Sequence, residues 1–188
     1  MVMPDELPML VQMLEETGIP YALTGSLASM AWGQPRATYD ADVLVDLRAA
    51  DIDKLIHAFP SPGWYLDRDA IVEALRGGGE FNAIHGATGT KVDFWVKTNR
   101  PADAMRFARR RRATVAGVAC WVLSPEDTIL AKLEWIQAAP SDRQKADVAG
   151  ILAAQADKLD FDYLREWAER LGARELLDEA LRGGWRTA

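Results

Sequence analysis

Two short motifs, separated by thirteen residues, constrain this chain more than any other part of its sequence. The first is Gly25-Ser26, which follows an apolar run ending near Leu23, and the second is Asp40-Ala41-Asp42, which opens the next apolar run. This pattern predicts a strand, a helix beginning at the Gly-Ser pair, and a second strand. Side chains alternate along a strand, so Asp40 and Asp42 are expected on one face, with α-carbons roughly 6.5 Å apart.

Together the two motifs suit the binding of a nucleoside triphosphate with a divalent metal. A helix N-terminus offers free backbone N–H groups and partial positive charge to phosphate, and Gly25 lets the backbone approach closely. Ser26 either caps the helix or bonds a phosphate oxygen. Two carboxylates supply the oxygen ligands that Mg²⁺ prefers. Each motif alone also has an ordinary structural interpretation, as a capped turn or as an exposed strand face with alternating acids.

A third acid favours the functional interpretation. Asp93 lies inside the otherwise apolar segment from Lys91 to Val96. An acid in such a strand is costly to bury unless it is paired or binds a metal. Asp93 therefore joins Asp40 and Asp42 as a candidate catalytic and metal-binding residue.

Composition narrows the class of protein. A chain of 188 residues, 49% hydrophobic and 27% charged, is typical of a globular protein with a substantial core. Its net charge of −6 argues against broad binding of nucleic acid by a basic face. The single cysteine, Cys120, excludes an intrachain disulfide and fits a reducing cytoplasm. No apolar run reaches the ~20 residues of a membrane span, and the early acids Asp5 and Glu6 argue against a signal peptide.

The spacing of apolar residues predicts helices and strands up to residue 123 and helices after it. Expected strands cover 21–24, 40–47, 81–85, 91–97, 113–115 and 118–123, and expected helices cover 5–17, 27–32, 49–58 and 68–75, with a short one before Arg109. Further helices are expected from Ser124, from Ser141, and over 160–171 and 173–181. The predicted fold class is α+β, with a mixed, mainly antiparallel sheet in residues 1–123 and a helical part, 124–188, packed on it.

As a set, Gly25, Ser26, Asp40, Asp42 and Asp93 resemble the nucleotidyltransferase superfamily, which has the polymerase-beta-like fold. Its members carry an apolar-Gly-Gly/Ser motif, a spacer, Asp-x-Asp/Glu and a later strand carboxylate, and the resemblance covers about residues 21–96. It implies transfer of a nucleoside monophosphate from a nucleoside triphosphate to an acceptor, with Mg²⁺ or Mn²⁺ held by the three aspartates and with release of pyrophosphate. The acceptor is left open among protein, RNA and small molecule.

The C-terminal half is similar to AbiEii-type and to small uncharacterised nucleotidyltransferase-like proteins. Many AbiEii-type proteins are toxins of toxin–antitoxin pairs, in which a helical lysine and a later aspartate follow the core. Lys132 and Asp147 match these positions, which implies nucleotide-binding roles and, for a toxin, an antitoxin partner. The alternatives are a solvated helix lysine and an ion pair between Asp147 and Arg143, four residues earlier.

Two further features have alternative interpretations. Four consecutive arginines form either a solvated edge or a binding site for RNA phosphates: Arg109, Arg110, Arg111 and Arg112. Trp32 and Trp95 lie near the motifs and either pack in the core or stack on a base. An alternative to an enzyme is a catalytically silent module that binds nucleotides, although three intact carboxylates argue against it.

Overall fold

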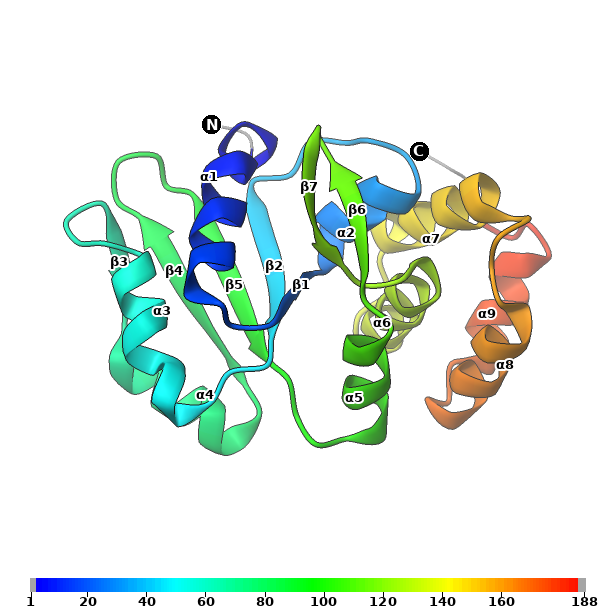
Figure 1. The fold of residues 1–188 in the computed structure, drawn as a ribbon. Helices are drawn as coiled ribbons and strands as arrows, with labels where there is room; N and C mark the ends of the chain where they lie inside the picture. Colours follow the sequence, from blue (N-terminus) through cyan, green and yellow to red (C-terminus); the bar gives the residue numbers. More distant parts are fainter. Residues whose placement is uncertain (1–2, 186–188) are drawn as a thin grey trace.

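The computed structural model describes residues 3–185 and has an α+β architecture (Figure 1). In this part of the chain, seven strands form one sheet in the order β3-β4-β5-β2-β1-β7-β6. The β2–β5 and β1–β7 pairs are parallel and the other four pairs are antiparallel, which confirms the expected mixed, mainly antiparallel sheet. The strands are β1 (Tyr21–Leu23), β2 (Asp40–Val45), β3 (Trp64–Leu66), β4 (Glu80–His85), β5 (Lys91–Val96), β6 (Arg111–Val115) and β7 (Val118–Val122).

Helices follow the expected order, and local signals explain several of their ends. The Asp67 carboxylate accepts from the first N–H groups of α4, and the Ser124 hydroxyl accepts from Asp127 N–H at the start of α6. No helix in residues 3–185 is long and apolar enough to cross a membrane. The helices are α1 (Met3–Thr17), α2 (Gly25–Trp32), α3 (Ile52–Ala58, preceded by the 3-10 turn Ala49–Asp51), α4 (Arg68–Gly77), α5 (Pro101–Ala108), α6 (Pro125–Ala138), α7 (Asp142–Gln155), α8 (Phe161–Arg170) and α9 (Arg174–Leu181).

The edge strand β3 is absent from the prediction made from sequence. It has only three residues, and it exists because it pairs antiparallel with β4. Trp64 anchors it by lying edge-on to Phe59, with 5.1 Å between the ring centroids. The equally short β1 was recognised because its three residues are all apolar and buried, whereas in β3 Trp64 is buried and Tyr65 is exposed.

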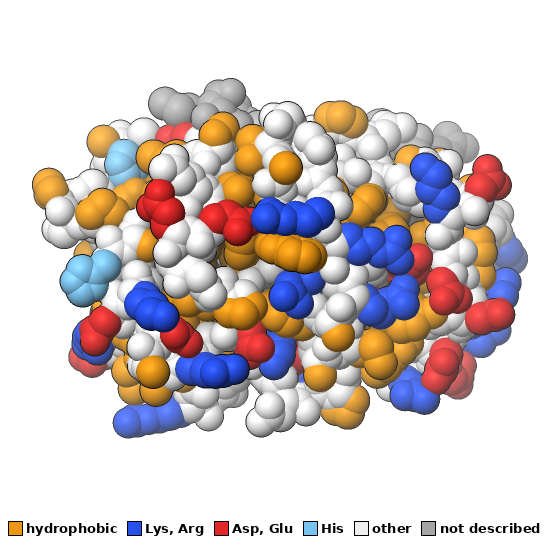
Figure 2. Space-filling view, in the orientation of Figure 1, with side chains coloured by type: hydrophobic (Ala, Val, Ile, Leu, Met, Phe, Trp, Pro, Cys, Tyr) orange, Lys and Arg blue, Asp and Glu red, His pale blue; other side chains and the backbone are white. Residues whose placement is uncertain are grey.

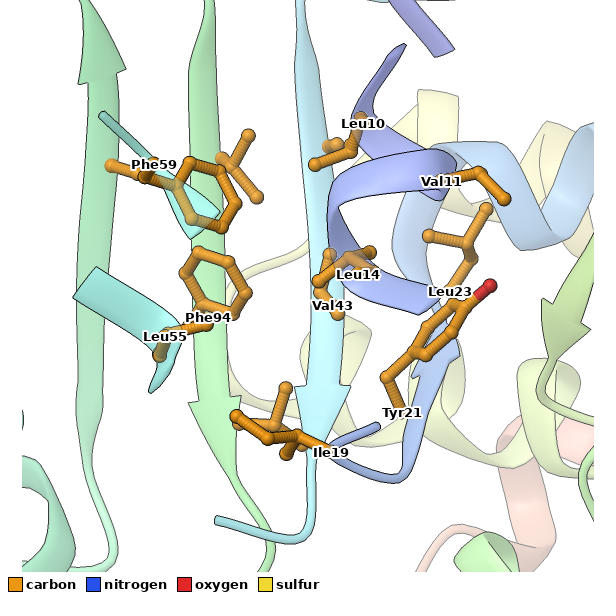
Figure 3. Packing of buried hydrophobic residues seen from close by; sticks show 14 of the residues in the cluster. Leu10, Val11, Leu14, Ile19, Tyr21, Leu23, Val43, Leu55, Phe59 and Phe94 are labelled. Atoms are coloured by element: carbon orange, nitrogen blue, oxygen red, sulfur yellow. The ribbon is translucent and has the colours of Figure 1, made fainter. Parts of the chain in front are cut away.

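The main hydrophobic core lies between the sheet and the helices α1 and α3 (Figure 3). Leu10 and Leu14 of α1 and Phe59, which directly follows α3, point at the sheet, where Val43 of β2 and Phe94 of β5 meet them. The Phe59 and Phe94 rings meet edge-on, with 5.5 Å between their centroids. Because side chains alternate, the residues between these apolar positions of β2 and β5 face the opposite side of the sheet.

A second hydrophobic cluster joins α6, α7, α8 and α9. It meets the main core at Trp32, which packs against both and whose indole N–H donates to the carbonyl of Leu123 at 2.7 Å. Core packing is therefore the role of Trp32. The division of the chain into a unit of residues 1–123 and a unit of 124–188 stays a prediction.

Candidate active site

The three candidate carboxylates lie on one face of two neighbouring strands. β2 and β5 run parallel in a register that sets Asp42 directly opposite Asp93, and Asp40 opposite Lys91. The intervening Ala41 and the other odd-numbered residues of β2 are buried in the main core. The aspartates therefore share the face turned away from α1 and α3. The sheet brings the three together, while their catalytic role stays a prediction.

The start of α2 lies directly against Asp42. The backbone N–H of Thr24 donates to the carbonyl of Asp42 at 2.9 Å, which joins the end of β1 to β2. Gly25 follows with φ +56°, and a Cβ atom at this position would overlap with Oδ2 of Asp42. Only glycine fits both the left-handed backbone and this contact. The helix begins at Gly25 with Thr24 as its N-cap, so Ser26 is not the capping residue.

Charge and burial both act on Asp42. Burial raises the pKa of its carboxyl group, and the negative charges of Asp40 and Asp93 raise it further. A hydrogen bond from the indole of Trp95 at 3.4 Å and the charge of Lys132 act in the opposite direction but do not cancel the rise. Ionised Asp42 is therefore an under-neutralised negative charge, which a cation in contact with it would stabilise.

The donor set fits a hard divalent cation by its chemistry, since it consists of carboxylate oxygens from adjacent strands. Asp40 accepts from the Thr38 hydroxyl at 2.8 Å, and Asp93 pairs with Lys91 at 2.8 Å. Each of these contacts uses one carboxylate oxygen and leaves the other. As they lie, residues 3–185 contain no group of three or more His, Cys, Asp or Glu side chains arranged to hold one metal ion.

A cationic cluster borders the start of α2. We define it by Arg36, Lys132 and Asp147. Arg36 Nε and Nη2 each donate to one Asp147 oxygen at 2.9 Å, and the Lys132 amino group contacts Asp147 Oδ2 at 2.7 Å. Arg36 Nη2 also donates to the Ser26 hydroxyl oxygen at 2.6 Å. Lys132 donates to Oε1 of Gln144 at 2.7 Å. The cluster thus connects the loop before β2, the start of α2, α6 and α7.

The alternative interpretations of Lys132, as a solvated helix lysine, and of Asp147, as the partner of Arg143, are both wrong. Lys132 is only 3% exposed, so it is not a solvated helix lysine. The Arg143 guanidinium donates to the carbonyl of Ala37 and does not pair with Asp147. Burial lowers the pKa of Lys132, which Asp147 opposes. Burial would raise the pKa of Asp147, but hydrogen bonds and charge from Arg36 and Lys132 outweigh it and hold the pKa below its usual range.

Arg36 is the site residue that the sequence analysis missed. It lies in the loop between Gly33 and Asp40, where one arginine carries no periodic or motif signal. Its partner Asp147 is 111 positions further along the chain. The only hint in the sequence is its place between the two motifs, four residues before Asp40.

Two tryptophans border the carboxylates on the side of α6. Trp95 lies on the same face of β5 as Asp93 and donates to Asp42. Its ring meets that of Trp135 edge-on, with 5.6 Å between the centroids. Trp135 is 51% exposed, so this aromatic side chain lies partly open beside Trp95. Trp95 is thus part of the site surface rather than of the main core.

The arginine run has partners within the chain. Arg109 lies over the Tyr163 ring at 3.8 Å and pairs with the buried acids Glu126 and Asp127 at 3.2 and 3.3 Å. Figure 2 shows Lys and Arg side chains gathered around an exposed hydrophobic side chain over β6 and β7. Arg110 and Arg112 lie over the Trp121 ring, Arg111 is near Glu126, and Arg112 pairs with Glu15. Arg109 is therefore not part of a solvated edge, and RNA binding by the run stays a prediction.

No protein-family model matches the sequence, and comparison with curated proteins gives no match. Solved structures do match. The antibiotic-resistance factor ANT(2″)-Ia, in complex with adenylyl-2″-tobramycin, is 12% identical and superposes with a TM-score of 0.64, covering 92% of this chain and 98% of that one. The lincosamide antibiotic adenylyltransferase LnuA, bound to lincomycin, is 13% identical with a TM-score of 0.55 over 78% of this chain and 94% of that one.

An antigenic nucleotidyltransferase-like protein from Paracoccidioides brasiliensis is 18% identical, with a TM-score of 0.53 over 98% of this chain and 95% of that one. At these identities the likeness concerns the fold. The narrower resemblance to AbiEii-type proteins, with its toxin role and antitoxin partner, stays a prediction. The sheet, the Gly25-Ser26 turn and the shared face of aspartates lead to one conclusion, that this chain has the nucleotidyltransferase fold.

Proposed function

We propose that this protein is a nucleotidyltransferase that moves a nucleoside monophosphate from a nucleoside triphosphate to a hydroxyl group of a small acceptor molecule. The observation that carries the proposal is the shared face of β2 and β5, where Asp40, Asp42 and Asp93 lie together against the start of α2. Two of the proteins with this fold are described with antibiotics, as an adenylyl-tobramycin complex and as a lincosamide adenylyltransferase. They favour a small molecule over protein or RNA as acceptor.

In the proposed reaction the acceptor oxygen attacks the α-phosphorus in line, a new P–O bond forms, and the bond to pyrophosphate breaks. Asp93 accepts the hydroxyl proton as general base. Ser26 and the first N–H groups of α2 hold the triphosphate. Lys132 offsets the negative charge that develops on the phosphate oxygens in the transition state. The acceptor lies on the side of Trp95 and Trp135, where an exposed ring offers an apolar surface.

Asp40, Asp42 and Asp93 would hold Mg²⁺ or Mn²⁺, which when bound neutralises phosphate charge and lowers the pKa of the acceptor hydroxyl. The raised pKa of Asp42 supports this role, because it reflects first the burial of the carboxyl group and then the nearby negative charges of Asp40 and Asp93, both of which a bound cation would offset. Nucleotide binding is therefore expected to strengthen with Mg²⁺.

The proposal is tested by incubating the protein with nucleotides labelled at the α-phosphate, Mg²⁺ or Mn²⁺, and panels of hydroxylated small molecules, RNA and proteins. Label should move to a small molecule, and Asp42→Asn should reduce the rate of this transfer by about 10³-fold. Asp46→Asn is the matched control, because Asp46 follows β2 on the same face but pairs with Lys97 at 3.0 Å. Transfer by Asp42→Asn at the rate of the control, or label found only on RNA or protein, would contradict the proposal in its present form.

A nucleotide-binding module without catalysis is the second candidate. It is favoured by the pairing of Asp93 with Lys91, which occupies one of the three carboxylates in the structure described. Calorimetry separates the two functions. A module would bind nucleoside triphosphate with an affinity indifferent to Mg²⁺ and to Asp93→Asn, whereas the enzyme would bind more tightly with Mg²⁺ and lose that gain in the variant.

A further inference from the structure

Arg36 is the most connected cation of the site, and its environment indicates a ligand. Asp147 holds it through two parallel hydrogen bonds, and it donates onward to Ser26 at the start of α2. The geometry points to Arg36 as a residue that binds the phosphate chain of the nucleotide, with Asp147 as the residue that positions it. This inference rests on the proposed function and adds to it a phosphate-binding residue.

The charges of the cationic cluster do not balance. Two positive side chains, Arg36 and Lys132, share the single carboxylate of Asp147, whose side chain is only 7% exposed. Lys132 is as deeply buried, whereas the Arg36 side chain is 23% exposed. Buried charges are costly unless they are paired. The cluster therefore has one positive charge in excess beside Ser26, and an anion placed there would neutralise it.

The side chains at the start of α2 also have hydrogen-bond donors that their partners within the chain do not use. Arg36 uses four of its five N–H groups, two on Asp147, one on Ser26 and one on the Ala37 carbonyl, and one remains. Lys132 uses two of its three, on Asp147 and Gln144. The Ser26 oxygen accepts from Arg36, so its own O–H is left to donate. Two donors of the cluster and the Ser26 hydroxyl thus remain for oxygen atoms of a ligand at the start of α2.

Asp147 positions the two cations rather than binding the nucleotide itself. Its oxygens are engaged by Arg36 and Lys132 at 2.7 to 2.9 Å, and a carboxylate would repel a phosphate. The family resemblance implied a direct contact between Asp147 and the nucleotide. The geometry instead gives Asp147 an indirect role in nucleotide binding. From α7, Asp147 fixes the orientations of Arg36 in the loop before β2 and of Lys132 on α6. Neither cation therefore has to be ordered when the nucleotide binds.

The test measures the affinities of ATP, ADP, AMP and inorganic tripolyphosphate, with Mg²⁺, for the wild type and for Arg36→Gln. We expect ATP and tripolyphosphate to bind about tenfold or more weakly to the variant, since a charge-assisted hydrogen bond is lost. AMP, which has one phosphate, should lose less than about threefold. Arg36→Lys keeps the charge without the planar fork and should recover part of the ATP affinity. Asp147→Asn should weaken ATP binding in the same pattern.

Arg143→Gln is the matched control, because Arg143 is also bonded to the Ala37 carbonyl but does not contact Ser26. It should bind ATP as the wild type does. Thermal unfolding of each variant shows whether it is folded, and Arg36→Lys provides the test if Arg36→Gln is not. Equal losses for ATP, ADP and AMP, or no loss at all, would overturn the role of Arg36 while leaving the proposed function intact. A wild type that binds none of the four probes would instead remove the proposed function, and this inference with it.

Discussion

Asp42 and Asp147 are both aspartates withdrawn from solvent in the same site, yet their surroundings act on them in opposite directions. At Asp42, burial and the charges of Asp40 and Asp93 raise the pKa. At Asp147, the bonds and charges of Arg36 and Lys132 outweigh burial and lower it. The acidic half of the site, Asp40, Asp42 and Asp93, therefore has a buried carboxylate beside like charges, whereas in the cationic half, the cationic cluster, the carboxylate is paired with both cations.

This difference indicates that the acidic half gains more from a ligand taken up from solution than the cationic half does. Functional sites often retain unfavourable local interactions that a ligand relieves. Three carboxylates on adjacent strands gain most from a cation, and the gain is expected only when nucleotide and metal bind together. The cationic half is held in place before binding, so it gives position more than driving force. Substitutions that change one half and leave the other in place separate these two contributions.

The largest effect is expected from Asp42→Asn, which combines loss of activity with a gain in stability. Nucleotidyl transfer should fall by about 10³-fold, roughly 4 kcal/mol in the activation barrier, because a charge at the reacting phosphate is lost. The folded-state pKa of Asp42 lies above its ordinary value of about 4, so the ionised group costs stability at neutral pH. That cost disappears as the pH falls through the folded-state pKa.

Thermal unfolding of Asp42→Asn and the wild type, followed from pH 7 downward, checks this prediction. The variant should unfold at a higher temperature at pH 7, and its advantage should shrink on acidification. Asp46→Asn, which removes an ion pair with Lys97, should show no such gain. An Asp42→Asn protein that is less stable at neutral pH would argue against the cost attributed to ionised Asp42.

Asp147→Asn should act in the opposite direction on stability. It leaves Arg36 and Lys132 without their shared carboxylate, and breaking a buried ion pair costs about 3 kcal/mol or more. Because the folded-state pKa of Asp147 is lowered, the stability it provides is present above about pH 4 and is lost as the pH falls through the folded-state pKa. Urea unfolding at pH 7 and in acid measures both, with the exposed Asp157→Asn as control. A loss below 1 kcal/mol at pH 7 would mean that the cluster is not preorganised.

The acidic half of the site was predicted from the sequence more completely than the cationic half, for a physical reason. The common face of Asp40 and Asp42 follows from the two-residue period of one strand, which is local. That β5 pairs with β2, and so sets Asp93 opposite Asp42, was expected only from the family resemblance. Arg36 was missed because its role depends on Asp147, whose position is decided by how α7 packs on α2. Periodicity reports the face of an element but says nothing about the partner it meets.

The fold shows the same limit. The long strands and helices have apolar patterns of their own and were predicted, with ends shifted by a few residues. The three-residue strand β3 has no such pattern and depends on β4 for its existence. The strand order across the sheet, with β1 between β2 and β7, is likewise a property of long-range contacts and was not predicted.

Gly25→Ala tests whether the acidic half depends on the close approach of α2. The new Cβ would overlap with Asp42 Oδ2, and the left-handed φ of +56° costs a non-glycine residue about 1–2 kcal/mol. Gly89→Ala is the matched control, since Gly89 has φ +70° and open space where a Cβ would be. Both variants should lose stability, measured by urea unfolding, but only Gly25→Ala should also lose activity, by about tenfold or more through displacement of Asp42. Equal activities would show that the position of Asp42 tolerates the displacement.

The smallest effect is expected from Trp135→Ala, which changes neither half but the surface beside them. The exposed ring has one aromatic neighbour in the site, Trp95, and an edge-on pair is worth about 0.5–1.5 kcal/mol, so the stability loss should stay near 1 kcal/mol. If the acceptor lies on this side, its KM should rise about tenfold while the KM of the nucleotide is unchanged. Met9→Ala, at an exposed position on α1, is the control for loss of a large side chain. A change in the KM of one substrate alone shows which of the two substrates contacts the Trp135 ring. A rise in the KM of the nucleotide instead would therefore place the nucleotide base, rather than the acceptor, on the pair of Trp95 and Trp135.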